Sequence, residues 1–391
     1  MQSRHLCEVT DCILYDGLLP RLDAVVAGCD DGRIDGLDLS YRVCADYLSS
    51  FLFGHCNGTT FLSLSSETKS RSDQRDTLER WRFHYENLSC HEAFFVQEMP
   101  GLYKFLKTVG INLLPRRYVE ATAFLESWMS AMADKAERAI TWKRSTGLAL
   151  PPKDEPVVYE TARAAVTEDS PHLSEQEQRM QIASEMFDHV CLVLGYAFWY
   201  LAQHPGAQHR IHTELQEHGI DMSSPSVYGQ DTISPSRAVQ LDSLPYLCAV
   251  INECLRMRPT STPLPRITPP DREVSVAGVD GIPPNTRINS FQWFMHRDPR
   301  KWERVDAWDP ERWLSRDGSD GRKHDGEDVL WPFASGPRMC LGNHWAYYCM
   351  QHVLAAACSR FVFTALPREE RECWPGSPED ELPVRVALRI D

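Results

Sequence analysis

The sequence predicts a mainly α-helical protein with a minor β component (an α+β fold), and three observations carry that prediction. Apolar residues recur with the helical period at residues 37–53 and again at residues 244–257. Residues 190–202 form an apolar run that is too short to cross a bilayer and is typical of a buried helix. Short segments rich in β-branched or aromatic residues predict a few strands, at residues 274–276, 286–294, 361–363 and 384–390.

The N-terminal half is predicted to be helices joined by irregular segments. Gly54 supplies the stop for the helix at residues 37–53. Residues 75–142 contain several helical stretches rich in aromatic side chains, for which core packing is the simplest interpretation. Residues 143–181 hold four prolines among many charges, so we expect a surface linker there. Residues 1–32 are expected to be an irregular N-terminal segment.

The C-terminal half adds two helices and the strands. Residues 218–240 are expected to be a loop. Pro245 suits the first turn of the helix at residues 244–257, and Pro259 ends that helix. Another helix follows Gly342, and the last two strands are expected to pair as a closing hairpin. We assign all of residues 1–391 to a single domain, because large one-domain enzymes reach this length.

Composition excludes some classes of protein. The net charge of −14 argues against a nucleic-acid partner. The thirteen cysteines are odd in number and irregularly spaced, which suits a reducing intracellular compartment better than a disulfide framework. The first residues contain no apolar run that could serve as a signal peptide, so we expect no membrane anchor in this chain.

One short segment, Phe333–Gly342, predicts chemistry, and we call it the cysteine loop. Its pattern indicates that Cys340 is a thiolate ligand of a heme iron, just ahead of a helix whose N-terminus stabilises negative charge. Gly336 and Gly342 would let the backbone approach a flat macrocycle. Arg338 would pair with a heme propionate. Phe333 would keep water from the sulfur.

The simplest alternative is that Cys340 is a buried core cysteine, as most intracellular cysteines are. The residue identities around it favour heme ligation instead. His296 is another possible iron ligand, but because the thiolate already accounts for the iron, a structural histidine is the better interpretation.

The cysteine loop resembles that of the cytochrome P-450 family, and other motifs of the family follow in the expected order. Glu253-Cys254-Leu255-Arg256 resembles its Glu-x-x-Arg helix motif. Asp309-Pro310-Glu311-Arg312-Trp313 resembles the segment whose arginine completes a Glu–Arg–Arg network. Leu264-Pro265-Arg266 resembles the strand that brings a second arginine to a propionate. The resemblance runs from about residue 35 to the end, and fungal microsomal members are the most similar.

The resemblance implies a cytochrome P-450 fold that lacks the N-terminal anchor and the first helices. It implies a heme (iron protoporphyrin IX) with Cys340 as axial ligand and Arg266 and Arg338 on the propionates. Glu253, Arg256 and Arg312 would form a structural network that braces the loop. Taken alone, a Glu-x-x-Arg pair is an ordinary surface ion pair worth about 0–1 kcal/mol.

The chain departs from the family pattern between Ser184 and Pro205. The family's distal helix normally carries small residues, then an acid and a threonine beside the oxygen site, and these are missing, as though two helical turns had been removed after Val190. Asp188 and His189 are weak local candidates for proton transfer, and Tyr196 is too bulky to replace a threonine. Heme binding is therefore better supported than efficient oxygenation.

Three functions are consistent with this pattern. The first is a heme-thiolate monooxygenase that inserts one oxygen atom from O2 into a small apolar substrate, with electrons from NADPH through a flavoprotein reductase, in fungal secondary-metabolite biosynthesis. The second is a non-oxygenase heme-thiolate enzyme, an isomerase or dehydratase. The third is an inactive, truncated remnant. The family usually resides at the endoplasmic reticulum membrane; without the anchor, we expect this chain in the cytoplasm.

Overall fold

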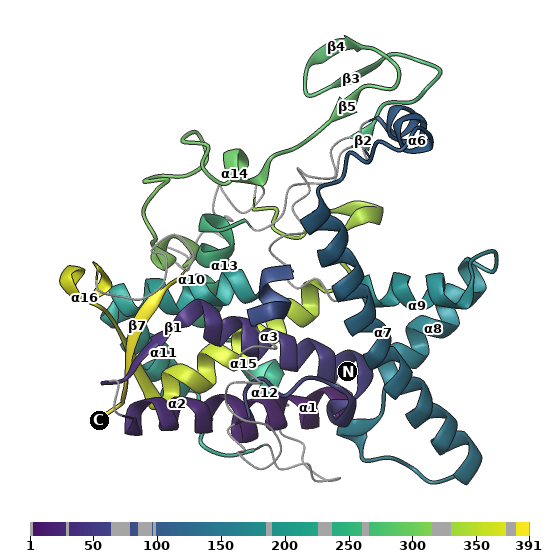
Figure 1. Ribbon diagram of the computed structural model, residues 1–391. Helices are drawn as coiled ribbons and strands as arrows, with labels where there is room; N and C mark the ends of the chain where they lie inside the picture. Colours follow the sequence, from purple (N-terminus) through teal and green to yellow (C-terminus); the bar gives the residue numbers. More distant parts are fainter. Residues whose placement is uncertain are drawn as a thin grey trace. The chain divides into compact units, whose positions relative to one another are not determined.

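The computed structural model confirms a mainly helical protein with small sheets (Figure 1). It describes residues 3–28, 31–63, 79–84, 96, 99–184, 190–225, 237–259, 266–314, 330–372 and 381–390. Contacts divide the chain into two compact units. The first unit comprises residues 1–22 and 41–188, and the second comprises residues 23–40 and 189–391. Each unit is described by itself below, and the assignment of residues 1–391 to one domain stays a prediction.

The N-terminal segment is helical, so the expectation of an irregular segment at residues 1–32 is wrong. Helix α1 (Arg4–Asp11) continues through a π-helical stretch, η1 (Cys12–Leu18), into α2 (Leu19–Ala27). Leu14, Leu18 and Leu22 are completely buried and recur every four residues, as on one face of a helix. Gly17 and Pro20 lie among these leucines and disfavour a helix interior, so helix propensity argued against a helix here.

Helix α3 (Gly36–Phe53) is present where the periodicity predicted it, with its stop at Gly54. The side chain of Asp35 accepts hydrogen bonds from the backbone N–H of Leu37 and Asp38, which satisfies free donors in the first turn. At the other end, Asn57 donates to the carbonyl of Phe53. Gly54 has φ +86° and ψ 144°, a backbone conformation that only glycine adopts readily.

We expect Gly54→Ala to destabilise the first unit by about 2–3 kcal/mol. An alanine there would carry the strained backbone, and its Cβ would also collide with the backbone oxygen of Asp154. Gly147→Ala is the matched control, because Gly147 has φ +69° but open space around its Cβ position, which leaves only a backbone cost of about 1–2 kcal/mol. Urea unfolding of both variants tests the difference, and equal losses would contradict the role of the collision.

The first unit continues with a short 3-10 turn, η2 (His55–Asn57), and then α6 (Pro100–Thr108) and the long α7 (Arg116–Thr146). Residues 143–181 were expected to be a surface linker, and this is also wrong. After α7 ends within them, they form η3 (Pro152–Asp154), α8 (Val157–Asp169) and most of α9 (Glu175–Ser184). Much of what holds α8 and α9 to α7 is polar: Tyr159, fully buried, donates to Glu137, which also pairs with Arg179. Charges that suggested a linker thus form ion pairs between helices.

The second unit contains α10 (Val190–Gln203), α11 (Pro205–Glu217), α12 (Arg237–Asp242), α13 (Pro245–Met257) and α15 (Asn343–Arg360). Helices α10, α13 and α15 match the predicted helices. Glu214 of α11 accepts from the backbone N–H groups of Tyr246 and Leu247 at 2.7 and 2.9 Å. A buried carboxylate thereby caps the first turn of α13, where the helix dipole favours negative charge.

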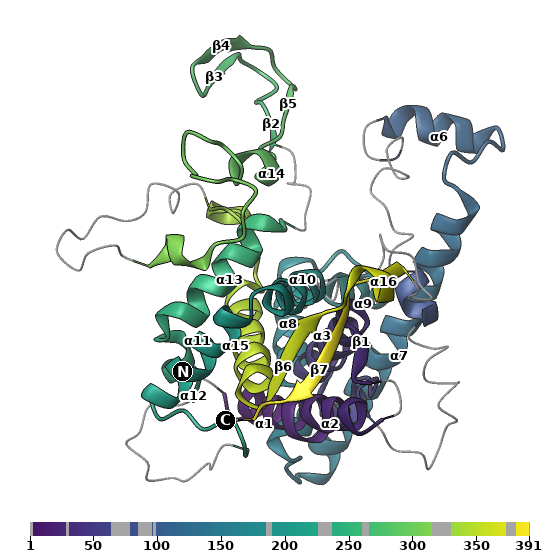
Figure 2. The same ribbon diagram turned by 90° about the vertical axis from the view of Figure 1, so that its left-hand side faces the viewer.

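The sheets of the second unit are small and antiparallel. Strands β6 (Phe361–Ala365) and β7 (Pro383–Leu388) pair as the predicted hairpin, with α16 (Arg368–Glu372) between them in sequence. Strand β1 (Arg33–Asp35), which was not predicted, pairs with β7, as Figure 2 shows. Strand β2 (Arg266–Ile267) pairs with β5 (Arg287–Ile288), and β3 (Val274–Val276) pairs with β4 (Val279–Ile282).

The strand predicted at residues 286–294 is wrong in its second half. Only β5 is extended, and α14 (Gln292–Met295) follows as a short helix. Phe291, Trp293 and Phe294 favour a strand by propensity, but they are exposed at 46%, 46% and 70%, so sheet packing does not stabilise them.

Gln208 of α11 joins a helix to the sheet. Its side-chain nitrogen donates to the carbonyls of Leu201 and Phe363 at 2.7 Å each, and its side-chain oxygen accepts from the N–H of Phe363 at 2.8 Å. The side chain is only 1% exposed. A buried amide that makes all of these hydrogen bonds fixes the position of β6 relative to α10 and α11.

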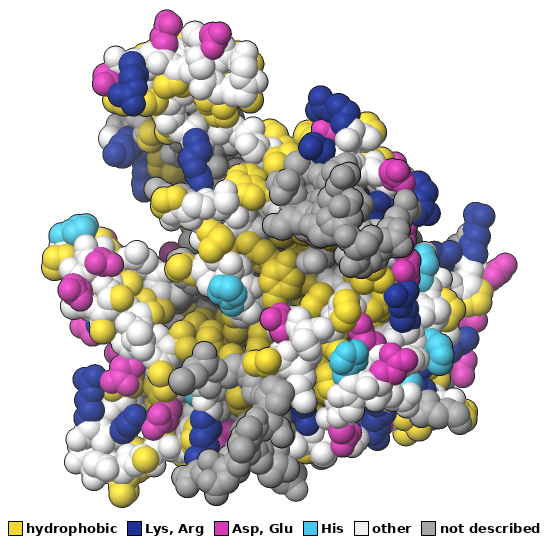
Figure 3. Space-filling model, turned by 180° about the vertical axis from the view of Figure 1, so that it is seen from behind, with side chains coloured by type: hydrophobic (Ala, Val, Ile, Leu, Met, Phe, Trp, Pro, Cys, Tyr) yellow, Lys and Arg dark blue, Asp and Glu magenta, His cyan; other side chains and the backbone are white. Residues whose placement is uncertain are grey.

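Charged side chains of both signs are interspersed over the face of the molecule drawn in Figure 3. Lys and Arg side chains do not gather into one area on that face.

Candidate functional site

The cysteine loop lies in the second unit, directly before α15. Its backbone turns through Ala334 and Gly336, whose φ angles are +59° and +68°, and through a 3-10 turn, η6 (Gly336–Arg338). The N–H of Cys340 then donates to the carbonyl of Phe333 at 2.9 Å, which closes the loop. Folding of the loop therefore places the thiol of Cys340 three residues before the start of α15.

Cys340 is exposed. The alternative that it is a buried core cysteine is therefore wrong. The first amides of α15 receive no side-chain cap from Gly342, so this 18-residue helix directs partial positive charge toward its N-terminal end. Met339 and Leu341, on either side of the thiol in sequence, are 46% and 88% exposed. An exposed soft donor flanked by uncovered apolar side chains suits a large apolar group that carries a metal.

The segment just before the loop is held by α14 and the residue that follows it. The side-chain nitrogen of Gln292 donates to the carbonyl of Trp331 at 2.8 Å, and Nε2 of His296 accepts from the N–H of Trp331 at 2.9 Å. Both side chains are buried, at 3% and 0% exposure. Burial lowers the pKa of His296 to about 4, so the ring is neutral at pH 7 and can accept this bond. His296 is thus a structural residue.

Glu253, Arg256 and Arg312 form a buried cluster that we call the charge network. Nε and Nη2 of Arg256 donate to the Glu253 carboxylate at 2.9 and 2.8 Å, and Nε of Arg312 donates to it at 3.1 Å. The N–H of Asp309 and Nε1 of Trp313 each add a hydrogen bond of 2.9 Å. Five donors therefore surround one carboxylate.

The charge network is connected to the segment that holds the cysteine loop. Nη1 of Arg256 donates to the carbonyl of His296 at 3.0 Å, while the ring of His296 accepts from Trp331. A continuous hydrogen-bonded path thus runs from Glu253 on α13 to the residue two positions before Phe333. The path gives the buried charges a physical means of fixing the loop.

The site thus combines an exposed thiol before a long helix with a buried Glu–Arg–Arg cluster that is connected to the thiol's loop. Comparison with known proteins agrees with this arrangement. The sequence model of the family described as Cytochrome P450 matches residues 121–378. The chain belongs to the cytochrome P450 family. The match includes the charge network and the cysteine loop.

Individual P450 relatives align over part of the chain. The cytochrome P450 monooxygenase hepC of Aspergillus oryzae is 31% identical over 205 residues, which is 51% of this chain and 37% of the relative. The monooxygenase astD of the same organism is 40% identical over 133 residues (33% and 25%), and cytochrome P450 71C3 of Zea mays is 30% identical over 194 residues (49% and 34%). The alignments span between 25% and 37% of the length of these relatives.

Membership of the P450 family implies a heme, and the residues present fit one. Cys340 offers the exposed thiol that a heme-thiolate protein requires. A Cβ added at Gly336 would have nothing within 4 Å, so the loop backbone is open to a flat group on that side. Phe333 packs against Tyr347 of α15 with ring centroids 5.4 Å apart, which holds an aromatic wall beside the loop. A Cβ at Gly342 would lie 3.8 Å from the Cys340 sulfur, in ordinary contact.

The other predicted site residues are placed as follows. Arg266 is exposed on β2, opposite Ile288 of β5. The backbone of Arg338 is in η6, and its side chain lies outside the described residues. Asp188 and His189 also lie outside them. Tyr196 is on α10, where the guanidinium of Arg258 lies 3.9 Å from its ring centroid, a cation–π contact.

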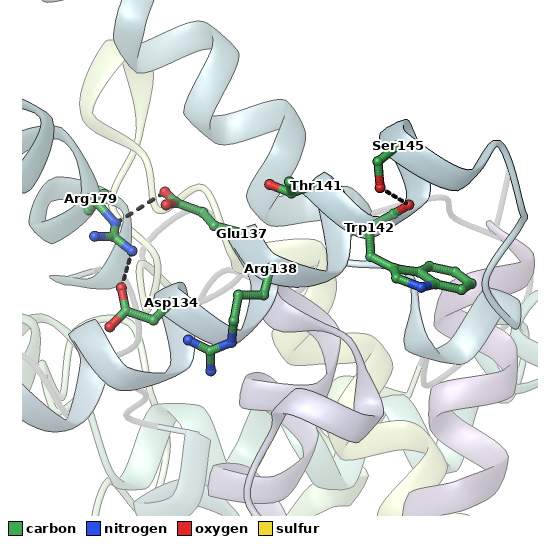
Figure 4. A pocket seen from close by; sticks show the side chains of 7 residues that line it. All are labelled: Asp134, Glu137, Arg138, Thr141, Trp142, Ser145 and Arg179. Carbon is green, nitrogen blue, oxygen red and sulfur yellow. Dashed lines mark hydrogen bonds and ion pairs between the residues drawn. The ribbon is translucent and has the colours of Figure 1, made fainter.

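Figure 4 shows a pocket in the first unit, of about 500 Å³, that does not involve the cysteine loop. Arg179 points between Asp134 and Glu137 and pairs with both, while Trp142 and Ser145 lie further along α7. Because the two carboxylates are already paired with Arg179, we assign this pocket no catalytic role.

Sequence reasoning missed the supporting roles of Gln292 and His296. Gln292 lies in the segment expected to be a strand, residues 286–294, and a strand gives no reason to look for an anchor of the loop. His296 itself was noticed as a possible ligand, and its position before Arg297-Asp298-Pro299 was the available signal. In the part of the chain that the structure describes, no helix is both long and apolar enough to span a membrane.

Proposed function

We propose that this protein is a heme-thiolate monooxygenase that inserts one oxygen atom from O2 into a small apolar organic substrate. The observation that carries the proposal is the exposed thiol of Cys340 at the N-terminus of α15, on a loop connected to the buried charge network. The fungal relatives named as cytochrome P450 monooxygenases support it. A secondary-metabolite pathway as its setting is part of the same proposal.

The roles of the residues follow from their chemistry. Cys340, at the N-terminal end of α15, would be the axial ligand. Arg266 and Arg338 would pair with the propionates, Gly336 and Gly342 would allow the backbone to come close, and Phe333 would exclude water from the sulfur. When bound, the heme supplies oxygen activation, with electrons that we propose come from NADPH through a flavoprotein reductase.

The alternative is a heme-thiolate enzyme that does no oxygenation, such as an isomerase or dehydratase. One sequence observation favours it: no threonine occurs between Ser184 and Pro205, where the family's proton-relay threonine is expected. Proton delivery to the oxygen site would then fall to residues such as Asp188 and His189. The two enzymatic functions differ in one measurable quantity, the consumption of NADPH and O2 in the presence of a reductase.

The difference spectrum of the reduced, carbon-monoxide-bound protein tests heme-thiolate ligation. We expect the wild-type chain reconstituted with heme to give the thiolate band and Cys340→Ser to lose it, because a serine hydroxyl is a far harder, more basic ligand. Cys56→Ser, which alters another exposed cysteine, should keep the band. Circular dichroism would show that Cys340→Ser is folded. A wild-type protein without the band, or a Cys340→Ser variant with it, would overturn the proposal.

Turnover with a reductase then distinguishes oxygenation from the alternative. A monooxygenase consumes NADPH and O2, and its product contains labelled oxygen when ¹⁸O2 is supplied. A heme-thiolate spectrum with product formed in the absence of NADPH and O2 would favour the isomerase or dehydratase. A folded chain without a heme spectrum would indicate the inactive remnant.

A further inference from the structure

A thiol and an amine face each other in the first unit, which contains none of the residues assigned to the heme. Nζ of Lys153 lies 3.6 Å from Sγ of Cys12, although 141 positions separate the two residues in sequence. Cys12 belongs to η1 and is 8% exposed, and Lys153 belongs to η3. The deprotonated forms of both groups are nucleophiles, and oxidation of the sulfur would make it an electrophile next to the amine.

The surrounding contacts hold the pair in place. The backbone N–H of Lys153 donates to the carboxylate of Glu8 on α1 at 3.2 Å. The His5 ring connects α1 to η3 and to α3, because its Nδ1 lies 2.8 Å from the carbonyl of Pro152 and its Nε2 lies 2.9 Å from that of Phe51. α1 and η3 are therefore fixed against each other at several points, and the short N–S distance is a property of the fold.

The resting pair is unreactive because the thiol and the amine are both protonated, and oxidation of the sulfur changes the protonation of the amine. Burial raises the pKa of the Cys12 thiol, and the negative field of Asp16 adds to this, while Lys153 opposes it. The pKa of Lys153 is raised chiefly by the Cys12 thiolate, against burial, which lowers it. An uncharged oxidised sulfur would no longer raise the pKa of Lys153, which burial would still lower against the opposing charges of Asp154 and Asp16, and the fraction of neutral, nucleophilic amine would grow.

We propose that Cys12 and Lys153 are a redox modification site at which peroxide drives formation of a covalent sulfur–nitrogen bond. In the first step, the Cys12 thiol and hydrogen peroxide give the sulfenic acid and one water, with the sulfur oxidised by two electrons and the peroxide reduced by two. In the second step, the neutral Lys153 amine attacks that sulfur, the hydroxyl leaves with the amine's proton as a second water, and a sulfenamide joins the two side chains. A thiol reductant reverses the bond.

The cross-link would join η1 to η3 and close a loop that includes α3 and α7. Such a closure restricts the unfolded chain, so the oxidised first unit is expected to melt at a higher temperature than the reduced one. The site uses neither Cys340 nor the charge network, so it does not depend on the proposed monooxygenase activity.

Peptide mapping of the full-length protein tests the cross-link. The protein is treated with hydrogen peroxide, its remaining thiols are alkylated, and it is digested with trypsin without reductant. Because trypsin does not cut after a modified lysine, the expected product links residues 5–21 to residues 145–163. Its mass equals the sum of the two peptides minus two hydrogen atoms, and dithiothreitol should separate them.

Three variants make the mapping decisive. Lys153→Arg keeps the positive charge but has no reactive amine, so the linked product should be lost. Cys12→Ser should lose it as well, and if this variant fails to fold, Lys153→Arg alone decides. Cys7→Ser removes the other thiol of the same peptide and should retain the link. Absence of the linked product in the wild type, a Cys7–Cys12 disulfide instead, a link with an added oxygen, or a link that persists in Lys153→Arg would overturn the proposal.

Discussion

Replacing Glu253 with glutamine is expected to lower the free energy of unfolding of the second unit by about 3–5 kcal/mol. Glu253 and Arg256 are both 0% exposed, and Arg312 is nearly as buried. The glutamine would leave two buried guanidinium groups without a compensating charge. Five N–H groups now donate to the Glu253 carboxylate. In the variant, the NH2 group of the glutamine is itself a donor, so the N–H groups that face it would lose their acceptor.

Urea unfolding of Glu253→Gln checks the effect, and a matched control is available next to Arg312 in the sequence. Glu311 pairs with Arg210, but the two side chains are 55% and 48% exposed. Glu311→Gln should therefore lose no more than about 1 kcal/mol, as exposed ion pairs do. A similarly small loss in Glu253→Gln would contradict the structural role of the charge network.

Glu253→Gln should also loosen the cysteine loop, because Arg256 reaches the loop through His296 and Trp331. In the proposed heme protein, the thiolate band should weaken at temperatures at which the variant remains folded. Glu311→Gln should keep the band up to its melting temperature.

A fall in pH from about 6.5 through about 4 is expected to destabilise the second unit through two buried histidines. Burial lowers the pKa of both His296 and His352 from 6.5 to about 4. The unfolded chain therefore binds more protons than the folded chain in this window, so stability rises with pH across it and is lost as the pH falls. Each histidine is worth about 3 kcal/mol, since one pKa unit equals about 1.4 kcal/mol.

Burial is the main cause for both rings, and the charges near them differ. Arg256 and Arg297 add positive charge near His296, and Arg237 does so near His352. His352 donates to the carbonyl of Tyr348 at 2.8 Å and stacks on its ring. In both cases a second proton would put an unpaired charge in the core.

Urea unfolding of the wild type and of His352→Gln at several pH values between 7 and 4 measures the effect. The stability difference between the two proteins should change by about 3 kcal/mol across this range in favour of the variant at low pH. The comparison cancels the opposite contribution of Asp46, whose pKa burial raises to about 6. Two profiles that stay parallel would show that His352 does not titrate in this way.

The parts of the protein that could be predicted from the sequence are those whose cause is local. The period of α3, the proline at the start of α13 and the apolar stripe of α15 depend on neighbouring residues, and all three helices were predicted. The cysteine loop was recognisable for the same reason, because Phe333, Gly336, Arg338, Cys340 and Gly342 lie within ten positions.

The parts that could not be predicted depend on distant partners. Strand β1 exists because Arg33 pairs with Arg385 at the far end of the chain. Helices α8 and α9 are stabilised by ion pairs with α7, and their charges resemble those of a linker when the partners are unknown. The hydrogen bond from Trp331 to His296 spans 35 residues, so the support of the cysteine loop had no signature in sequence.

The amide of Gln208 has a consequence for solubility. Strand β6 is the outer strand of its sheet, and such strands offer unpaired backbone groups to which another chain can add by β-pairing. By occupying both the N–H and the carbonyl of Phe363, Gln208 mimics a neighbouring strand and blocks intermolecular growth of the sheet at that point. The side chain that anchors α11 thus also guards the protein against aggregation.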